Sequence, residues 1–269
     1  MNRFVAFLDA LAFSKYVENN TLERSKVALE TLREIETYAN RIPAMPGFPV
    51  LEGKFINSMV YSDSIVFYTD GSEKSDFCRL VHVVKIAVRS SLTTPTPLRG
   101  AISYGECHVE PDKGMIVGKG YLDACESEHK QLWAGAYVSD IAIDYVRSIS
   151  DDCIKFLVDI GFLIEYSIPF KDAITKPTSN LAINWANPVI NEDVAEAKEL
   201  ERKMFYGYPF CETLIHNEMQ KIQPNTESDT NCNIDLSSFD AKIMETINNT
   251  REFYLSARDK GNSPFHHLD

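Results

Sequence analysis

The feature that most constrains this chain is a short apolar strand that runs into a helix through an aspartate. Residues 3 to 9 are mostly apolar toward both faces, which predicts a buried strand ending at Asp9. From Ala10 to about Asn40 the apolar residues recur at helical spacing. The chain therefore opens with a strand and a helix, and an acidic side chain lies at their junction.

A second aspartate lies at the tip of a predicted hairpin. Residues 54 to 61 and 64 to 69 favour two strands around the turn Ser62–Asp63. Next come a predicted helix over residues 76 to 91 and a predicted strand over residues 98 to 105. The order βα, ββ, αβ is that of the ferredoxin-like split βαβ arrangement, in which two helices cover one face of an antiparallel sheet. We therefore predict an α+β fold with this core.

The rest of the chain predicts the end of this domain and a helical appendage. A helix is expected from Gly118 to about Leu132, followed by strands over residues 137 to 139, 162 to 167 and 180 to 186. Helical patterns over 192 to 222 and 239 to 258 flank a polar, turn-rich stretch over 223 to 231. We predict one domain over residues 1–190 and a C-terminal helical appendage over residues 191–269.

Charge and composition exclude several classes of partner. The net charge is −12 without a marked Lys/Arg run, which argues against nucleic acid and anionic lipid as partners. The apolar segments fall short of the roughly 20 residues that a membrane span needs, so direct membrane insertion is not expected. Six cysteines without a Cys-x-x-Cys pair, and an N-terminus without signal-peptide character, predict a reduced, cytoplasmic protein.

Asp9 and Asp63 together predict a function that neither residue predicts alone. Taken singly, Asp9 fits an ordinary helix N-cap and Asp63 fits an ordinary turn residue. In a split βαβ sheet, however, the first strand lies beside the hairpin, so both carboxylates reach the same end of the sheet. Two carboxylates so close repel each other unless a cation lies between them. The pair therefore predicts a site for divalent metal ions.

Three motifs, in this order along the chain, resemble the catalytic domain of class III nucleotide cyclases. They are Asp-Ala-Leu-Ala-Phe-Ser from Asp9, the Ser62–Asp63 hairpin, and Arg-Gly-Ala-Ile-Ser-Tyr-Gly from Arg99. The hairpin Tyr-Ser-Asp-Ser-Ile-Val-Phe, the strand Leu-Arg-Gly-Ala-Ile and the Gly-x-Gly helix entry are most similar to the pyrimidine cyclases of the bacterial Pycsar anti-phage systems. We take the resemblance to cover roughly the first two-thirds of the chain.

This resemblance implies an activity and partners. The expected reaction converts UTP or CTP into the 3′,5′-cyclic monophosphate and pyrophosphate, and a separate effector reads the product as a second messenger of anti-phage defence. The resemblance also implies a homodimer with active sites at the interface. Two divalent ions, Mn²⁺ or Mg²⁺, would be held by Asp9, Asp63 and the carbonyl of Ala10.

The same resemblance assigns residues to the triphosphate. It places the amides from Ala10 to Phe13 and the guanidinium of Arg99 against the phosphates. It also brings a lysine from the loop before the last strand, Lys171 or Lys176, toward them. A surface salt bridge for Arg99 and a solvated loop position for the lysines remain the ordinary alternatives.

The nucleobase is assigned to apolar and aromatic side chains. Met59, Tyr61 and Tyr104 are the candidates to line a small pocket, because an aromatic ring can stack on a pyrimidine. Their ordinary alternative is strand packing. At Met59 the purine cyclases carry a lysine that reads the base, and a methionine cannot donate that hydrogen bond.

Two further departures keep other functions open. Leu122 and Glu126 stand where the cyclase family has an asparagine and the transition-state arginine. The alternatives are a purine cyclase with altered base contacts, and a catalytically degenerate cyclase-like dimer that binds nucleotide as a regulatory module. Retention of both Asp9 and Asp63 favours an enzyme, because a degenerate domain has no electrostatic reason to keep two mutually repelling carboxylates.

Overall fold

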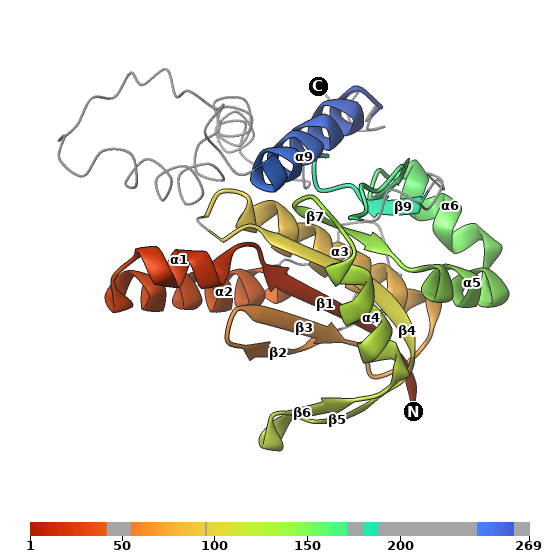
Figure 1. The fold of residues 1–269 in the computed structure, drawn as a ribbon. Helices are drawn as coiled ribbons and strands as arrows, with labels where there is room; N and C mark the ends of the chain where they lie inside the picture. The colour runs from red at the N-terminus through yellow and green to blue at the C-terminus, as the bar shows by residue number, and fades with distance from the viewer. Residues whose placement is uncertain (42–54, 95, 172–179, 188–240, 261–269) are drawn as a thin grey trace.

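The centre of the molecule is a seven-stranded sheet in the order β2-β3-β1-β4-β7-β9-β8 (Figure 1). The computed structural model describes residues 1–41, 55–94, 96–171, 180–187 and 241–260. Neighbouring strands are antiparallel except for the parallel pair β4 and β7. The strands are β1 (Asn2–Ala10), β2 (Asn57–Tyr61), β3 (Ser64–Tyr68), β4 (Leu98–Glu106), β7 (Gly135–Val138), β8 (Leu163–Tyr166) and β9 (Asn180–Ile183).

The first half of the chain builds the predicted split βαβ core. Strand β1 lies between β3 and β4, and β2 lies outside β3 at the edge of the sheet. The connecting helices are α1 (Phe13–Asn19), α2 (Leu22–Arg41) and α3 (Lys74–Ser91). The predicted α+β class and ferredoxin-like strand order are confirmed.

The single helix expected from Ala10 to Asn40 is wrong in detail, because it is two helices. Helix α1 ends at Asn19. The next residue, Asn20, has an extended backbone, and its side-chain amide donates to the carbonyl of Tyr16 at 2.9 Å. Such a side-chain bond competes with the helical pattern. Helix α2 then starts afresh at Leu22.

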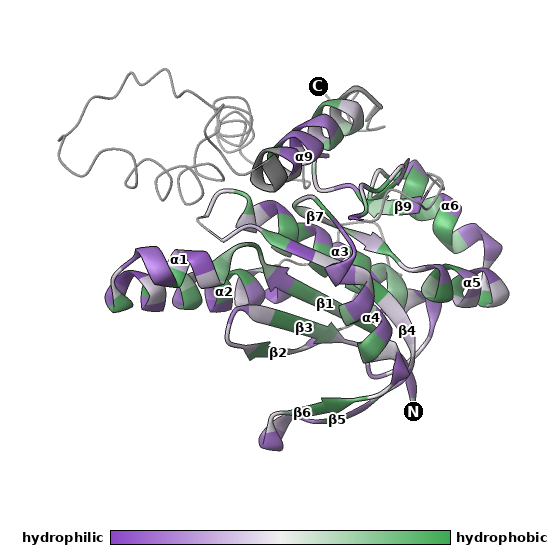
Figure 2. Cartoon of the chain, viewed as in Figure 1, coloured by the Kyte–Doolittle hydropathy of each residue, from purple (hydrophilic) through white to green (hydrophobic). Residues whose placement is uncertain are grey.

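The sheet has two differently covered faces. Phe4, Ala6 and Leu8 of β1 belong to the main core under α2 and α3, whereas Val5 and Phe7 point to the other side. On that second side α4 (Lys119–His129) packs over β4 and β1, so α4 lies in front of the sheet and α3 behind it (Figure 1). Figure 2 shows that β3 is hydrophobic along most of its length, whereas α1 and α2 alternate between polar and apolar residues.

A small hairpin leads into α4. It consists of β5 (His108–Glu110), a 3₁₀ turn η2 (Pro111–Lys113) and β6 (Met115–Val117). Its Val109 and Ile116 pack on the second face of the sheet. The helix that follows fits closely against β4, because a Cβ on Gly120 would lie 2.9 Å from the backbone nitrogen of Gly105.

The C-terminal helix α9 (Ala241–Lys260) belongs to the same packed body as the sheet. Phe253 is fully buried, with ring centroids 4.7 Å from Trp133 and 5.2 Å from Trp185. This helix matches the one predicted over residues 239 to 258. The predicted domain boundary at residue 190, the helical stretch 192 to 222 and the loop 223 to 231 lie outside the described residues.

Helices α5 (Asp140–Ile149) and α6 (Asp151–Asp159) complete the described structure. Cys78, Cys107, Cys125 and Cys153 are free thiols, while Cys211 and Cys232 lie outside the described residues. Over the part of the chain with assigned structure, no helix combines the length and apolarity that crossing a bilayer requires.

Candidate active site

Asp9 lies in a row of side chains that crosses the second face of the sheet. Strand register pairs it with Ser64 on β3 and with Arg99 on β4, and pairs Ser64 in turn with Tyr61 on β2. Directly opposed residues of antiparallel strands point to the same face. The row therefore reads Tyr61, Ser64, Asp9, Arg99. Within it the Ser64 hydroxyl donates to Asp9 Oδ1 at 2.7 Å.

Asp63 lies at the tip of the β2–β3 hairpin, beside the end of β1. Its backbone carbonyl accepts a hydrogen bond from the Ala10 amide at 3.0 Å. Ser62 has a φ of 49°, in the left-handed region, which lets the hairpin reverse within two residues. The structure therefore brings Asp9 and Asp63 to the same end of the sheet.

The positive charge near Asp9 is too small to offset the burial of its carboxyl group. Burial raises its pKa from 3.8 to about 6, and the charges of Glu128 and Asp63 add to the rise. The hydrogen bond from Ser64 and the charge of Arg99 act in the opposite direction but do not offset it. A raised carboxyl pKa means that the ionised form is disfavoured where it stands. A bound cation would remove that cost.

Arg99 is paired with a glutamate that sequence reasoning missed. Its guanidinium donates to Glu128 Oε1 from both Nε and Nη2, and to the Gln131 carbonyl at 3.1 Å from Nη1. Arg99 is 9% exposed and Glu128 4%, so this is a buried pair and not a surface salt bridge. It links β4 to the last turn of α4 beside Asp9.

A pattern in α4 held the signal for Glu128. Gly120, Ala124 and Ser127 recur at positions i, i+4 and i+7, and all three are buried. Small residues at that spacing mark a helix face that packs closely. Glu128 lies on that face, where a carboxylate needs a cationic partner. Leu122 and Glu126 are exposed on the outer side of the same helix.

The predicted base-contacting residues do not all gather at this site. Met59 and Tyr61 lie on the face that carries Asp9, and the Tyr61 hydroxyl donates to Met59 Sδ at 3.3 Å. Tyr104 pairs with Phe4, five residues back along β1 from Asp9, or roughly 17 Å away at the usual strand rise.

Tyr104 also lies on the opposite face of the sheet. Its ring stacks on Tyr145 with centroids 3.6 Å apart and approaches Phe4 of the main core. The structure therefore does not bring Tyr104 to Asp9, and strand packing is its role in this chain.

Two of the backbone amides just before α1 already donate hydrogen bonds within the protein. Ala10 donates to the Asp63 carbonyl, and Leu11 donates to the Pro97 carbonyl at 2.9 Å. Phe13 begins α1 and buries its ring beside Tyr16. The predicted phosphate cradle from Ala10 to Phe13 therefore loses its first two donors to the fold.

Lys171 lies beside the connection that leaves α4. Its backbone amide donates to the Lys130 carbonyl at 2.8 Å, and the preceding Phe170 bridges to Gln131. Because Gln131 also binds Arg99, this segment approaches the Asp9 row through the backbone. Lys176 lies outside the described residues.

The pair of aspartates is the candidate donor set for a metal ion. Among the described residues, no group of three or more His, Cys, Asp or Glu side chains is arranged to hold a metal ion. Mg²⁺ characteristically binds proteins through one or two carboxylates, and substrate phosphates and water complete its shell. Asp9 and Asp63 fit that mode of binding.

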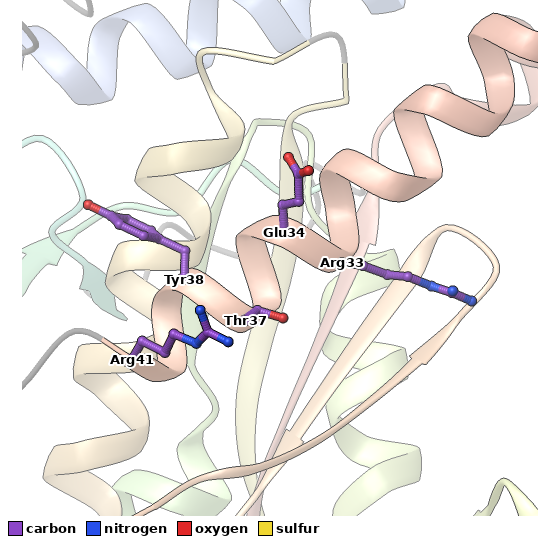
Figure 3. A pocket seen from close by; sticks show the side chains of 5 residues that line it. All are labelled: Arg33, Glu34, Thr37, Tyr38 and Arg41. Carbon is purple, nitrogen blue, oxygen red and sulfur yellow. The ribbon is translucent and has the colours of Figure 1, made fainter.

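A surface hollow of about 330 Å³ lies elsewhere, along α2 (Figure 3). Its lining comes from one helix and consists of Arg33, Glu34, Thr37, Tyr38 and Arg41. Helix α2 packs on the first face of the sheet, where its Leu32 and Ile35 are buried in the main core. The hollow is therefore separate from the acidic end of β1.

Comparisons with known proteins give structural likeness only. No protein-family model and no curated protein matches the sequence. The adenylyl cyclase CyaB from P. aeruginosa is 14% identical at a TM-score of 0.42, over 68% of this chain and 93% of that one. The catalytic core of a rhodopsin-guanylyl cyclase with converted specificity, in complex with ATPalphaS, is 12% identical at a TM-score of 0.45, over 67% of this chain and 93% of that one. The guanylyl cyclase domain of the RhoGC fusion protein from the aquatic fungus Blastocladiella emersonii is 11% identical at a TM-score of 0.44, over 68% of this chain and 94% of that one.

Proposed function

We propose that this chain is a metal-dependent nucleotidyl cyclase. The observation that carries the proposal is the convergence of Asp9 and Asp63 at one end of the sheet, where burial and neighbouring negative charge raise the pKa of Asp9 to about 6. Such a site favours a divalent cation and, through the cation, a triphosphate. The motif order around the two aspartates supports the same assignment.

Each residue of the site has a separate proposed role. Asp9, Asp63 and the Ala10 carbonyl would hold two Mg²⁺ or Mn²⁺ ions. When bound, the ions would lower the pKa of the ribose 3′-hydroxyl and offset charge on the phosphates. The Ser64 hydroxyl fixes the direction of the Asp9 carboxylate. Arg99 would contact phosphate only by leaving Glu128, so we assign it to holding α4 against β4.

We further propose a pyrimidine substrate, UTP or CTP, and a homodimer with shared sites. Met59 supplies no donor for a purine, and its neighbour Tyr61 offers an aromatic ring on the face that carries Asp9. The anti-phage role, in which a separate effector reads the cyclic nucleotide, rests on the motif resemblance to the Pycsar cyclases.

The test is a product assay with four substrates. Purified protein and Mn²⁺ are incubated with ATP, GTP, CTP or UTP, and products are identified by mass. We expect one dominant cyclic pyrimidine product, abolished in Asp63→Asn and retained in the matched exposed control Asp112→Asn, both checked for native circular dichroism.

Other outcomes separate the alternatives. A cyclic purine product would replace the pyrimidine assignment by a purine cyclase. A folded, dimeric protein that binds a nucleotide but converts none of the four would replace the enzyme by a regulatory nucleotide-binding module.

A further inference from the structure

Two buried cysteines far apart in the sequence face each other between α3 and α6. The Sγ atoms of Cys78 and Cys153 are 3.4 Å apart, and the residues are 75 positions apart along the chain. Cys78 is 1% exposed and Cys153 is 5% exposed. A disulfide requires a sulfur–sulfur distance of about 2.05 Å, so a closure of roughly 1.4 Å would join them.

The two thiols are not equivalent. The hydrogen bond with Cys78 lowers the pKa of Cys153 and nearby Lys74 acts in the same direction, although burial opposes them. The same hydrogen bond and burial raise the pKa of Cys78. The lower pKa of Cys153 makes its sulfur the better attacking group and leaves Cys78 as the resolving sulfur.

Cys153 lies near the surface end of its helix. It is in the first turn of α6, directly after the exposed Asp151 and Asp152. Ends of short surface helices open locally at low free energy. Cys78 lies within the 18-residue helix α3 and is 1% exposed, so local opening of the first turn of α6 is the route that we infer for the oxidant.

We propose that Cys78 and Cys153 form an oxidisable pair, which closes to a disulfide joining α3 to α6 when the protein meets a peroxide. The Cys153 sulfur attacks one peroxide oxygen and the O–O bond breaks, so the other oxygen takes the thiol proton and leaves as water. Cys78 then attacks the resulting sulfenic sulfur, the S–O bond breaks, and the hydroxyl takes the second thiol proton and leaves as water. The two sulfurs lose two electrons, which hydrogen peroxide accepts.

The other described thiols lack this arrangement. Cys107 is fully buried on the second face of the sheet beside Val5 and Met59. Cys125 is half-buried on α4, where burial raises its pKa. The pair is also independent of the Asp9 site, so the proposal stands or fails without reference to cyclase activity.

The test uses the full chain with Cys211→Ser and Cys232→Ser, which removes the two thiols outside the described residues. The protein is treated with hydrogen peroxide, denatured, alkylated without reductant and mapped by peptide mass. We expect a cross-linked peptide that contains Cys78 and Cys153, about 2 Da lighter than the sum of the two thiol peptides. It should disappear with dithiothreitol, while Cys125 remains alkylated.

A second measurement compares the stability of the oxidised and reduced protein. The melting temperature of the oxidised protein should exceed that of the reduced protein by several degrees, because a bond that closes so long a loop restricts the unfolded chain. Cys153→Ser should abolish this difference and Cys125→Ser should keep it. The proposal is overturned if both sulfurs stay fully alkylatable in samples where methionines have been oxidised, or if either one pairs with another cysteine.

Discussion

The Ser64 hydroxyl donates a hydrogen bond to Asp9 Oδ1 at 2.7 Å, across the ladder between β1 and β3. This bond is the strongest influence that lowers the pKa of Asp9, yet the pKa still lies at about 6. Burial and the charges of Glu128 and Asp63 therefore outweigh it. Asp9 is a carboxyl that is fixed in direction and lacks a sufficient counter-charge, and this combination leads to the first prediction.

Asp9→Asn should stabilise the metal-free protein at pH 7.5. The pKa of Asp9 in the folded state, about 6, exceeds its ordinary value of 3.8, so the folded state binds the proton more tightly. Stability therefore falls as the pH rises from about 4 through 6, and the full cost applies above that range. After allowance for solvent screening at a partly exposed group, the cost is about 1 to 2 kcal/mol.

Thermal unfolding in a chelating buffer checks this prediction. Asp9→Asn should melt a few degrees above the wild type at pH 7.5, and the gap should narrow toward pH 4.5. An Asn variant that melts at or below the wild-type temperature at pH 7.5 would show that the carboxylate carries no electrostatic cost.

The buried Arg99–Glu128 pair should both stabilise α4 and set the charge at Asp9. Glu128→Gln leaves the buried guanidinium without its carboxylate, which should cost about 3 kcal/mol of unfolding free energy. It should also lower the pKa of Asp9, because one neighbouring negative charge is lost. Arg99→Met should raise that pKa.

Carboxyl-carbon NMR titration of Asp9 and denaturant unfolding measure the two effects. Glu126→Gln, on the exposed side of the same helix, is the control and should change neither quantity. A shift of the Asp9 titration in the same direction by Glu128→Gln and Arg99→Met would contradict the prediction.

The close fit between α4 and β4 should make Gly120 hard to replace. A Cβ there would lie 2.9 Å from the backbone nitrogen of Gly105, so Gly120→Ala must push the helix off the strand. We expect a loss of about 1 to 3 kcal/mol. Gly114→Ala is the matched control, because its φ of 61° brings backbone strain but its nearest neighbour, Tyr61, lies 3.8 Å away.

Urea unfolding of the two glycine variants separates steric from conformational cost. Gly114→Ala should lose only about 1 kcal/mol, the usual cost of a left-handed residue with a side chain. A circular dichroism spectrum that stays native in both variants makes the comparison valid. The prediction is wrong if Gly120→Ala proves the milder change.

Thr250 should anchor the C-terminal helix to the segment that enters β7. Its hydroxyl accepts a hydrogen bond from the buried amide of Ala134 at 2.8 Å. Thr250→Val keeps the shape of the side chain but leaves that amide without its acceptor, which should cost about 1 to 3 kcal/mol. The neighbouring Asn248 is exposed, so Asn248→Ala should leave stability within about 0.5 kcal/mol of the wild type.

Denaturant unfolding and amide hydrogen exchange at Ala134 check the role of Thr250. Exchange at that amide should speed up in Thr250→Val and stay unchanged in Asn248→Ala. Equal stability of the two variants would mean that the Thr250 hydroxyl does not anchor α9, which would then be held by its aromatic contacts and by the hydrogen bond from Asn249 to the Leu132 carbonyl.

Local sequence pattern predicted the elements that surround the site. The apolar run into Asp9 and the turn at Ser62–Asp63 correspond to β1 and to the β2–β3 hairpin. These patterns are readable because strand and turn preferences act over a few neighbouring residues. The prediction that Tyr104 joins the base pocket was wrong, although its odd spacing from Arg99 along one strand already places it on the other face of the sheet.

The contact partners of these residues could not be predicted from the local sequence. Arg99 is 29 positions from Glu128, and Cys78 is 75 positions from Cys153. The spacing of small residues in α4 could have indicated that Glu128 is buried, but neither its partner Arg99 nor the Cys78–Cys153 contact has a local signal, because each contact depends on how a helix packs against a distant element. The break between α1 and α2 was not predicted either. It lies at Asn20, where the backbone is extended and the side chain donates to the carbonyl of Tyr16.

By itself the sequence determined the alternation of strands and helices and the acidic residue at each of two chain reversals, because these follow from short-range periodicity and turn chemistry. Only the tertiary structure decided that Asp9 shares its surroundings with Glu128, that Arg99 is already engaged, and that the last helix packs into the core. The physical reason is that burial and charge at a site are summed over everything within a few ångströms, and most of those neighbours come from distant parts of the chain.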